Sequence, residues 1–389
     1  MATIDYARRV ESYYPSKVRE VFALAAKPDM ISFAGGAPAL DDLDFDFLAD
    51  ASARILREQG RAALQYSIGQ GVPVLREAIT QVMSLEGMTA EANRQVVTVG
   101  SQFALNLVAQ NFVDPGDVVL AESPSYAGGM AVFRAYEGEV RQVATDADGL
   151  VPAAEGRRCR LVYTIPTYQN PGGTLMPEHC RVELMEICER HDVYVIEDNP
   201  YGLLGFDGAT HRALKADHPE RVFYLGSFSK IFAPGLRLGW VDPPAEHVAM
   251  LVGTNETGVL NPPTFTQLLV AAYLRDDGWQ DALGHMRQVY ARKAGVMVDA
   301  LREHMPAGVT WNDVAGGFYV WLTLPEHVDA YDMVAPAIDR GVVYVPGVAF
   351  YVDGRGTHEL RMSFCLPSTE QIATGVEVLA DVLRQESAR

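Results

Sequence analysis

One lysine lies among small hydroxyl residues and close to an arginine. Ser227, Phe228, Ser229 and Lys230 follow one another, and Arg237 comes seven residues later. Short hydroxyl donors and a planar guanidinium suit a phosphate monoester, and an amine beside them can bond covalently to a carbonyl compound. A polar loop with a surface lysine is the alternative. The chain has five lysines, and we expect the other four to lie on amphipathic or frayed stretches: Lys17, Lys27, Lys215 and Lys293.

An acid and an amide follow two other apolar segments. Asp198 comes directly after residues 193–197, and a carboxylate after a buried strand is costly unless it meets a cation. A protonated pyridine nitrogen is such a cation, whereas capping of the next turn is the alternative. Asn170 lies in the rigid turn 166–173, where its N–H group could reach a phenolate-like oxygen. An ordinary Asn-Pro-Gly turn is the alternative there.

Two further segments contain residues that bind anions. Gly100, Ser101 and Gln102 follow an apolar strand and open a helix, where free N–H groups favour an anion. A plain capped turn is the alternative. Arg361 lies among apolar strand residues, where an arginine is seldom buried without an anion. A substrate carboxylate or a structural salt bridge would satisfy it.

The elements that must position these residues alternate between helix and strand from about residue 70 to 245. Short apolar segments predict strands at 96–99, 118–121, 160–164, 193–197 and 222–226. Apolar stripes predict helices at 72–83, 101–113 and 177–191, the second of them capped by Ser101. The alternation predicts an α/β fold with a mostly parallel sheet between helices. Ligands bind beyond the carboxyl ends of such strands, which is where the candidate residues lie.

The last third of the chain has a different pattern. It begins with one long helical stretch, 264–304. Strands are predicted at 318–324, 342–345 and 360–364, with helices near 329–340 and 368–385. We therefore expect three parts: an N-terminal segment (1–45) that packs on the small domain or across the active site, a large domain (46–300), and a smaller α+β domain (301–389).

The composition argues against several classes of protein. The 389 residues include 32 Lys and Arg against 50 Asp and Glu, a formal net charge of −18, so we expect no nucleic-acid partner. No segment approaches the roughly 20 apolar residues of a membrane span, and the first residues lack a signal peptide's apolar run. The four cysteines form no CxxC motif, and we expect reduced thiols, no metal site and a cytoplasmic location.

Three motifs occur together in an order that resembles fold-type I pyridoxal 5′-phosphate (PLP)-dependent aminotransferases of classes I and II. They are Tyr168-Gln-Asn-Pro-Gly172, Glu197-Asp-Asn-Pro-Tyr-Gly202, and Gly226-Ser-Phe-Ser-Lys230 followed by Arg237-Leu-Gly-Trp240. The likeness extends from about Met30 to the C-terminus. Segments that begin at Ser16, Ser32 and Leu64 are similar to the α-aminoadipate/kynurenine aminotransferase branch.

The resemblance implies PLP as the cofactor and a role for each matching residue. Lys230 would hold PLP and move a proton at the substrate's Cα, and Asp198 would pair with the pyridine nitrogen. Asn170 and Tyr201 would hydrogen-bond the 3-oxygen, and Tyr126 would stack on the ring. The residues implied for the phosphate are Ser101, Gln102, Ser227, Ser229, Arg237 and, from the neighbouring subunit of a homodimer, Tyr66.

The resemblance also implies substrate-binding residues. Arg361 would bind the α-carboxylate, with Gly36 and Asn170 against the substrate. Arg19 matches a position that contacts the substrate's side chain, although an ion pair with a residue such as Glu20 or Asp41 is equally open. Residues 39–46 and 255–263 depart from the branch, and we expect both segments to border the substrate pocket or the dimer interface.

The activity implied is transfer of an amino group between an L-amino acid and a 2-oxo acid by a ping-pong mechanism, with glutamate and 2-oxoglutarate as one pair. A PLP enzyme of the same fold that performs elimination, cyclisation or oxidation is the alternative, because the cofactor supplies the same electron sink in each. The effector domains of PLP-sensing transcription regulators share the pattern. Those regulators carry an N-terminal winged helix, and the ~30 residues before Ile31 are too few for one.

Overall fold

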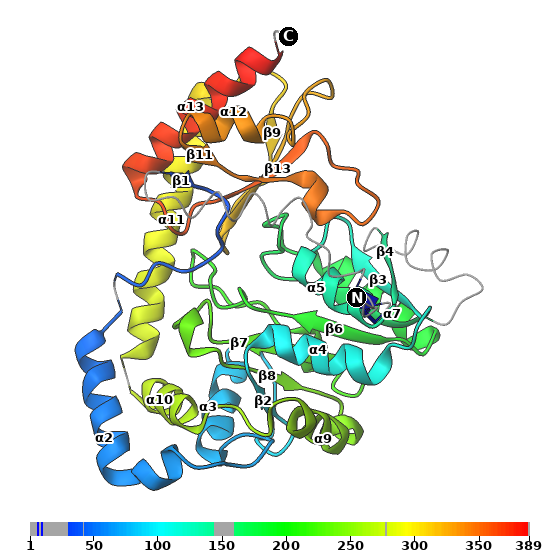
Figure 1. Cartoon of the computed structure of the whole chain (residues 1–389), viewed down its shortest axis with the longest axis vertical. Coiled ribbons are helices and arrows are strands. Elements are labelled where there is room, and N and C mark those ends of the chain that lie inside the picture. Colours follow the sequence, from blue (N-terminus) through cyan, green and yellow to red (C-terminus); the bar gives the residue numbers. More distant parts are fainter. Residues whose placement is uncertain are drawn as a thin grey trace, which may run out of the picture.

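A seven-stranded sheet forms the centre of the molecule (Figure 1). The computed structural model describes residues 6–7, 9–10, 30–41, 43–143, 159–276 and 278–387. The strands of the sheet are β2 (Val96–Thr98), β3 (Val118–Glu122), β4 (Glu139–Val143), β5 (Cys159–Thr164), β6 (Tyr194–Asp198), β7 (Val222–Ser227) and β8 (Gly239–Asp242). Their order is β2-β8-β7-β6-β5-β3-β4. Only β8 runs antiparallel to its neighbours in this sheet, so the sheet is mostly parallel, as predicted.

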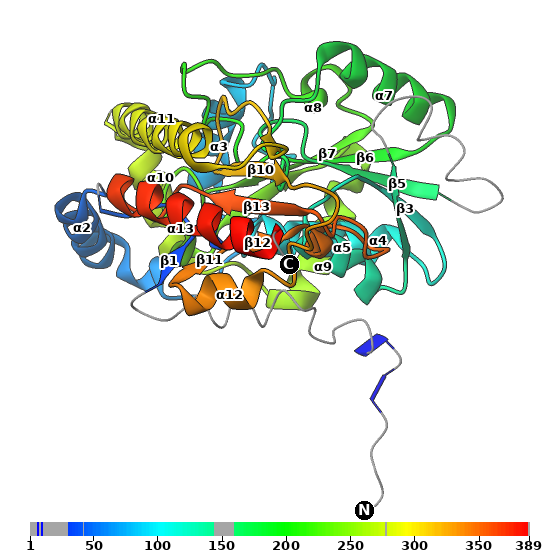
Figure 2. The same cartoon turned by 90° about the horizontal axis from the view of Figure 1, so that it is seen from above.

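Helices cover both faces of the sheet. The helices of this part are α2 (Phe45–Ala63), α3 (Pro73–Ser84), α4 (Ser101–Phe112), α5 (Ala127–Ala135), α7 (Glu178–Arg190), α8 (Leu214–Asp217), α9 (Val248–Val259), α10 (Thr264–Arg275) and α11 (Trp279–His304), of which α2 packs on α10. Figure 2 shows α7 and α8 on one side of the strands and α4 and α9 on the other. Successive strand residues face opposite layers: Val118 and Leu120 pack with Leu184 of α7, whereas Val119 and Ala121 belong to the main core.

A smaller antiparallel sheet lies beside the first. It consists of β9 (Thr310–Trp311), β10 (Tyr319–Thr323), β12 (Val345–Pro346) and β13 (Glu359–Ser363), in the order β12-β13-β10-β9. The short strand β1 (Ile31–Ser32) pairs in parallel with β11 (Val342–Val343). The helices of this part are α12 (Val334–Asp339) and α13 (Thr369–Ser387), and α11 packs along α13 (Figure 1).

The five strands predicted for the large sheet are confirmed to within one residue at each end. The predicted stretch 264–304 is wrong as a single helix, because it is interrupted between α10 and α11. There the carboxylate of Asp276 accepts the N–H group of Gly278 at 3.1 Å and forms a turn. The helix near 329–340 is shorter than predicted, because Asp329 accepts the N–H groups of Tyr331 and Asp332 in a turn that precedes α12.

Two other expectations need correction. The predicted strand 342–345 is two strands, β11 and β12, which belong to different sheets. Ser101 does not cap α4: the cap position is Gly100, with φ +90°, and no side chain bonds to the helix start. The sequence reading did not predict β4, β8, α2, α5 or α9. The three-part division at residues 45 and 300 remains a prediction.

No helix within the described ranges combines the length and the hydropathy needed to cross a membrane.

Candidate active site

A cavity of about 420 Å³ lies beyond the carboxyl ends of β5, β6 and β7, where residues of both sheets meet. Twelve of the fourteen residues predicted for the site line it: Gly36, Ser101, Gln102, Tyr126, Asn170, Asp198, Tyr201, Ser227, Ser229, Lys230, Arg237 and Arg361. Ile165, Pro200 and Tyr319, which were not predicted, line it as well. Eight separate segments of the sequence therefore meet at this cavity, which lies at the strand ends as expected for this class of sheet.

Asp198, the last residue of β6, presents a carboxylate oxygen that has no protein partner. Tyr163 donates a hydrogen bond to Oδ2 at 2.7 Å, whereas Oδ1 is buried and unpaired within the described part of the chain. Burial raises the pKa of this carboxyl to about 6, against the opposing effects of the Tyr163 hydroxyl and of Lys230. An orphaned oxygen of this kind fits a cationic N–H group, such as a protonated pyridine nitrogen.

Lys230 follows β7, and its amine lies in the same cavity. Its Nζ atom donates to the carbonyl of Gly36 at 2.7 Å. Burial lowers the pKa of this lysine, and the charges of Arg361 and Arg237 act in the same direction. A lower pKa leaves more of the amine neutral near pH 7, which is the form that attacks a carbonyl.

The phosphate-binding candidates gather at the start of α4. A Cβ on Gly100 would lie 2.7 Å from the Arg237 guanidinium, and one on Gly239 would lie 2.6 Å from the backbone nitrogen of Ser101. Glycine at both positions therefore lets the segment around Arg237 approach the helix start. Because Ser101 makes no capping bond, its hydroxyl remains available to the cavity. Together with the helix start, these groups form an anion site.

Arg361, in β13, is 4% exposed and reaches the cavity from the smaller sheet. Its two terminal nitrogens donate to Asn170 Oδ1 and to the carbonyl of Ala34, both at 2.8 Å. Its Nε atom is buried without a partner, and no carboxylate among the described residues pairs with it. The alternative interpretation of Arg361, a structural salt bridge, is therefore not found among the described residues. A buried guanidinium with a free N–H group fits an anionic ligand.

Three buried residues that support the cavity have no motif that marks them. Tyr163 bonds to Asp198, and Tyr319 bonds to Tyr201. Glu122 accepts hydrogen bonds from Thr164, Ile165 and Gln169 and so anchors the turn that carries Asn170. In the sequence the two tyrosines look like ordinary strand aromatics. The only signal is register: Arg361 pairs with Trp321, and Tyr319 is two residues away on the same face of β10.

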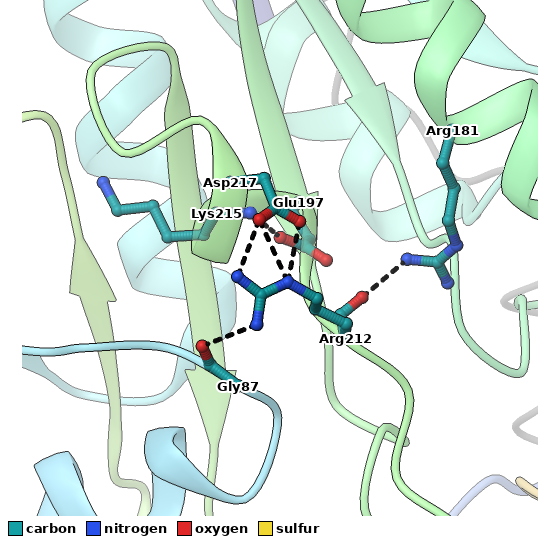
Figure 3. Close-up of polar contacts among 6 residues, drawn as sticks. All are labelled: Gly87, Arg181, Glu197, Arg212, Lys215 and Asp217. Atoms are coloured by element: carbon teal, nitrogen blue, oxygen red, sulfur yellow. Dashed lines mark hydrogen bonds and ion pairs between the residues drawn. The ribbon is translucent and has the colours of Figure 1, made fainter.

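A second polar network includes Glu197, which precedes Asp198 in β6 (Figure 3). Glu197 and Asp198 are neighbours in β6, so their side chains face opposite sides of the sheet. Glu197 accepts the N–H groups of Leu214 and Lys215, both at 3.0 Å. The expectation that Lys215 lies on an amphipathic or frayed stretch is wrong, because this side chain is buried and donates to the carbonyls of Pro219 and Val222 at 2.8 Å. Lys215 therefore does not reach the cavity.

Arg212 connects its own loop to α8 and to the turn after α3. Arg212 forms a two-pronged ion pair with Asp217 and donates to the carbonyl of Gly87 at 3.1 Å. Arg181 in turn donates to the carbonyl of Arg212 at 3.1 Å (Figure 3). These contacts hold the position of the segment around Arg212, which follows the cavity-lining turn 198–202 in the sequence.

One predicted residue lies outside the cavity of this chain. Tyr66 is 78% exposed on the loop after α2, beside the exposed side chains of Leu64 and Ile68. Residues 255–263, which depart from the branch, form the α9–α10 corner against this loop, where Asn261 accepts the N–H group of Ser67 at 3.3 Å. Arg19 lies outside the described residues, as does Glu20.

Comparisons with known proteins agree with this arrangement. Residues 28–379 match the family described as "Aminotransferase class I and II". Aromatic-amino-acid aminotransferase 1 of Thermococcus litoralis is 33% identical over 99% of this chain and 96% of its own length. The 2-aminoadipate transaminase of Thermus thermophilus is 36% identical over 95% of this chain and 94% of its own.

A solved structure has the same fold. LysN, an α-aminoadipate aminotransferase from Thermus thermophilus, was crystallised with N-(5′-phosphopyridoxyl)-L-leucine. It superposes with a TM-score of 0.90 at 33% identity, covering 98% of each chain. The chain therefore belongs to the class I and II aminotransferases, a family of PLP-dependent enzymes.

Proposed function

We propose that the cavity binds PLP through Lys230 and transfers an amino group between an L-amino acid and a 2-oxo acid, with glutamate and 2-oxoglutarate as one pair. One observation carries the assignment of the site: a lysine with a lowered pKa and a buried, unpaired carboxylate oxygen of Asp198 line the same cavity. When bound, PLP supplies a ring that withdraws electrons from the substrate's Cα.

The residues of the chain then have separate tasks. Asp198 would keep the ring nitrogen protonated, because its free Oδ1 atom can accept a hydrogen bond from that N–H group in a buried setting. Asn170 donates to the 3-oxygen, because its own Oδ1 already accepts from Arg361 and leaves the amide N–H groups free. Tyr201 donates to the same oxygen, and Tyr126 stacks on the ring. Lys230 would remove the proton from the substrate's Cα as a general base and deliver it to the cofactor's C4′ carbon as a general acid.

Separate groups of residues would hold the substrate and the phosphate. Arg361 binds the α-carboxylate beside Gly36. Ser101, Gln102, Ser227, Ser229 and Arg237 bind the phosphate. For the donor we propose amino acids with a large apolar or a long acidic side chain, in line with the names of the two relatives above; Arg19 is the proposed partner of an acidic one.

We further propose a homodimer that shares its two sites. The support is a patch of exposed apolar side chains, Leu64, Tyr66, Ile68 and Leu260, which are 49–78% exposed around the α2 end and the α9–α10 corner. Tyr66 on this patch would reach the phosphate of the partner subunit's cofactor. We also propose a cytoplasmic location, which the four free cysteines support.

Two half-reactions test the proposal. Purified protein loaded with PLP is expected to show the band of the lysine-bound cofactor near ~420 nm. Glutamate should remove this band and 2-oxoglutarate should restore it. Profiling donors against 2-oxoglutarate then identifies the side-chain class. Release of ammonia with no return of the band would instead identify an elimination.

A further inference from the structure

Tyr319 lines the cavity, yet the proposed function gives it no task. It lies in β10 and is 3% exposed. Its hydroxyl is 3.1 Å from the hydroxyl of Tyr201, which is 2% exposed. Its ring faces the guanidinium of Arg361, with 4.2 Å from the carbon of that group to the ring centre. One side chain therefore contacts both the donor to the 3-oxygen and the proposed carboxylate-binding residue.

The backbone at Gly36 fixes the place of the Tyr319 hydroxyl. A Cβ on Gly36 would overlap that hydroxyl, so only glycine leaves room for it. The carbonyl of the same glycine accepts the hydrogen bond of Lys230. The hydroxyl is thus held between Gly36 and Tyr201.

Each of the two hydroxyls has one proton, which decides the direction of their hydrogen bond in the working enzyme. If Tyr201 donates to the 3-oxygen, its proton is no longer available to Tyr319. Tyr319 must then be the donor and Tyr201 the acceptor. A hydroxyl that accepts a hydrogen bond becomes a stronger donor itself, because the two bonds polarise one another in a dry site.

We propose that Tyr319 is a positioning residue that orients the Tyr201 hydroxyl toward the cofactor's 3-oxygen and holds the plane of the Arg361 guanidinium. The inference rests on the proposed function, since it assumes PLP in this cavity. The hydroxyl of Tyr319 performs the first task and its ring performs the second. The two tasks are separable, because phenylalanine at position 319 removes only the hydroxyl and leucine removes the ring as well.

The test is an absorbance titration of the PLP-loaded protein, which follows the pKa of the lysine-bound nitrogen. Tyr319→Phe should raise this pKa by about 0.5 to 1 unit, because a weaker donor at the 3-oxygen stabilises its anionic form less. The KM for glutamate should stay within about twofold of wild type, since the ring still faces Arg361. Tyr319→Leu should raise the pKa equally and also raise the KM by about 10-fold.

Two controls separate this effect from general damage. Tyr344→Phe removes a buried hydroxyl that donates to the carbonyl of Ala330, away from the cavity, and should leave the absorbance pKa unchanged. In Tyr201→Phe protein, the further change Tyr319→Phe should add nothing, because the hydroxyl it acts on is gone. Thermal melting of the cofactor-free variants reports separately whether each one folds.

The outcomes distinguish the two proposals. Wild-type protein that stays colourless with PLP would overturn the proposed function and this inference together. Coloured Tyr319→Phe protein whose absorbance pKa lies within about 0.2 unit of wild type would overturn this inference alone. So would an effect that adds in full to that of Tyr201→Phe.

Discussion

Tyr163 sets the environment of the acid on which the cofactor site depends. Its hydroxyl donates the one hydrogen bond that the Asp198 carboxylate accepts from the described residues, at 2.7 Å. We predict that Tyr163→Phe weakens PLP binding roughly 10-fold, because a hydrogen bond to a charged group contributes about 1.5–3 kcal/mol and part of this is recovered by the ring nitrogen.

The affinity can be measured by titrating cofactor-free protein with PLP. Tyr168→Phe is a matched control, since Tyr168 is an equally buried tyrosine whose hydroxyl contacts His211 instead. Unchanged affinity in Tyr163→Phe would show that the Asp198 carboxylate needs no protein donor.

For single residues, the sequence predicts the side chains that belong to motifs and does not predict the buried side chains that contact them. Lys230 and Arg361 could be singled out because a lysine between serines and an arginine inside an apolar strand are unusual. Tyr163 and Tyr319 could not, because an aromatic residue in a strand has the same pattern whether it fills a core or donates to an acid. The position of Lys215 was also mispredicted, because its amine is buried between the local carbonyls of Pro219 and Val222 and beside the buried carboxylate of Asp242 at 3.8 Å, which only the fold brings near.

The turn after α3 is coupled to the turn that carries Asp198 by a buried acid. Glu86 accepts hydrogen bonds from Asn199 at 2.6 Å and from the hydroxyl of Tyr224 at 2.5 Å. Burial raises the pKa of this carboxyl to about 7. The folded protein therefore binds a proton here that the unfolded chain releases above its ordinary pKa of 4.5.

We predict a stability that falls as the pH rises through this range. The contribution of Glu86 is fully present below pH ~4.5 and is lost as the pH passes ~7, by up to about 3 kcal/mol. Glu86→Gln should remove this part of the slope when urea unfolding of cofactor-free protein is compared at pH 5 and pH 8. Glu58→Gln, an exposed position on α2, serves as the control. A slope that is the same in wild type and Glu86→Gln would contradict the prediction.

Among the elements, the buried parallel strands were the most predictable. Strands such as β7 are buried along their whole length and consist mainly of apolar residues, because both faces are covered. The antiparallel β8 lies beside β7 although it follows the long turn that contains Arg237, and nothing local in the sequence marks its direction. At the break between α10 and α11 the Asp276 carboxylate accepts the N–H group of Gly278, two residues later, and such a local bond competes with helix formation without changing the apolar periodicity.

For the whole molecule, the central prediction concerns the shared site. If Tyr66 serves the partner's cofactor, a mixed dimer of Lys230→Ala and Tyr66→Ala subunits contains one site that has both residues. An equal mixture of the two variants, assayed at limiting PLP after reassociation, should regain about a quarter of wild-type activity. Activity no higher than that of Tyr66→Ala alone would mean that Tyr66 acts within its own subunit or not at all.

The contacts between the N-terminal segment and residues far away in the sequence could not be predicted from the sequence. Ile31 pairs with Val342 of β11, and the carbonyl of Phe33 accepts the N–H group of Ser363 in β13, so the N-terminal residues contact two strands of the smaller domain. The same segment brings Gly36 to Lys230. These contacts join residues that are roughly 200 to 330 positions apart, and no local pattern marks the partners.

Reductive trapping tests the covalent role of Lys230 most directly. Borohydride treatment of the PLP-loaded protein fixes the cofactor on the amine that holds it, and peptide mapping then locates the label among only five lysines. The label is expected on Lys230 alone, and it should be absent from Lys230→Ala protein. A label on Lys215 or Lys293, or none on a protein that has bound PLP, would contradict the assignment.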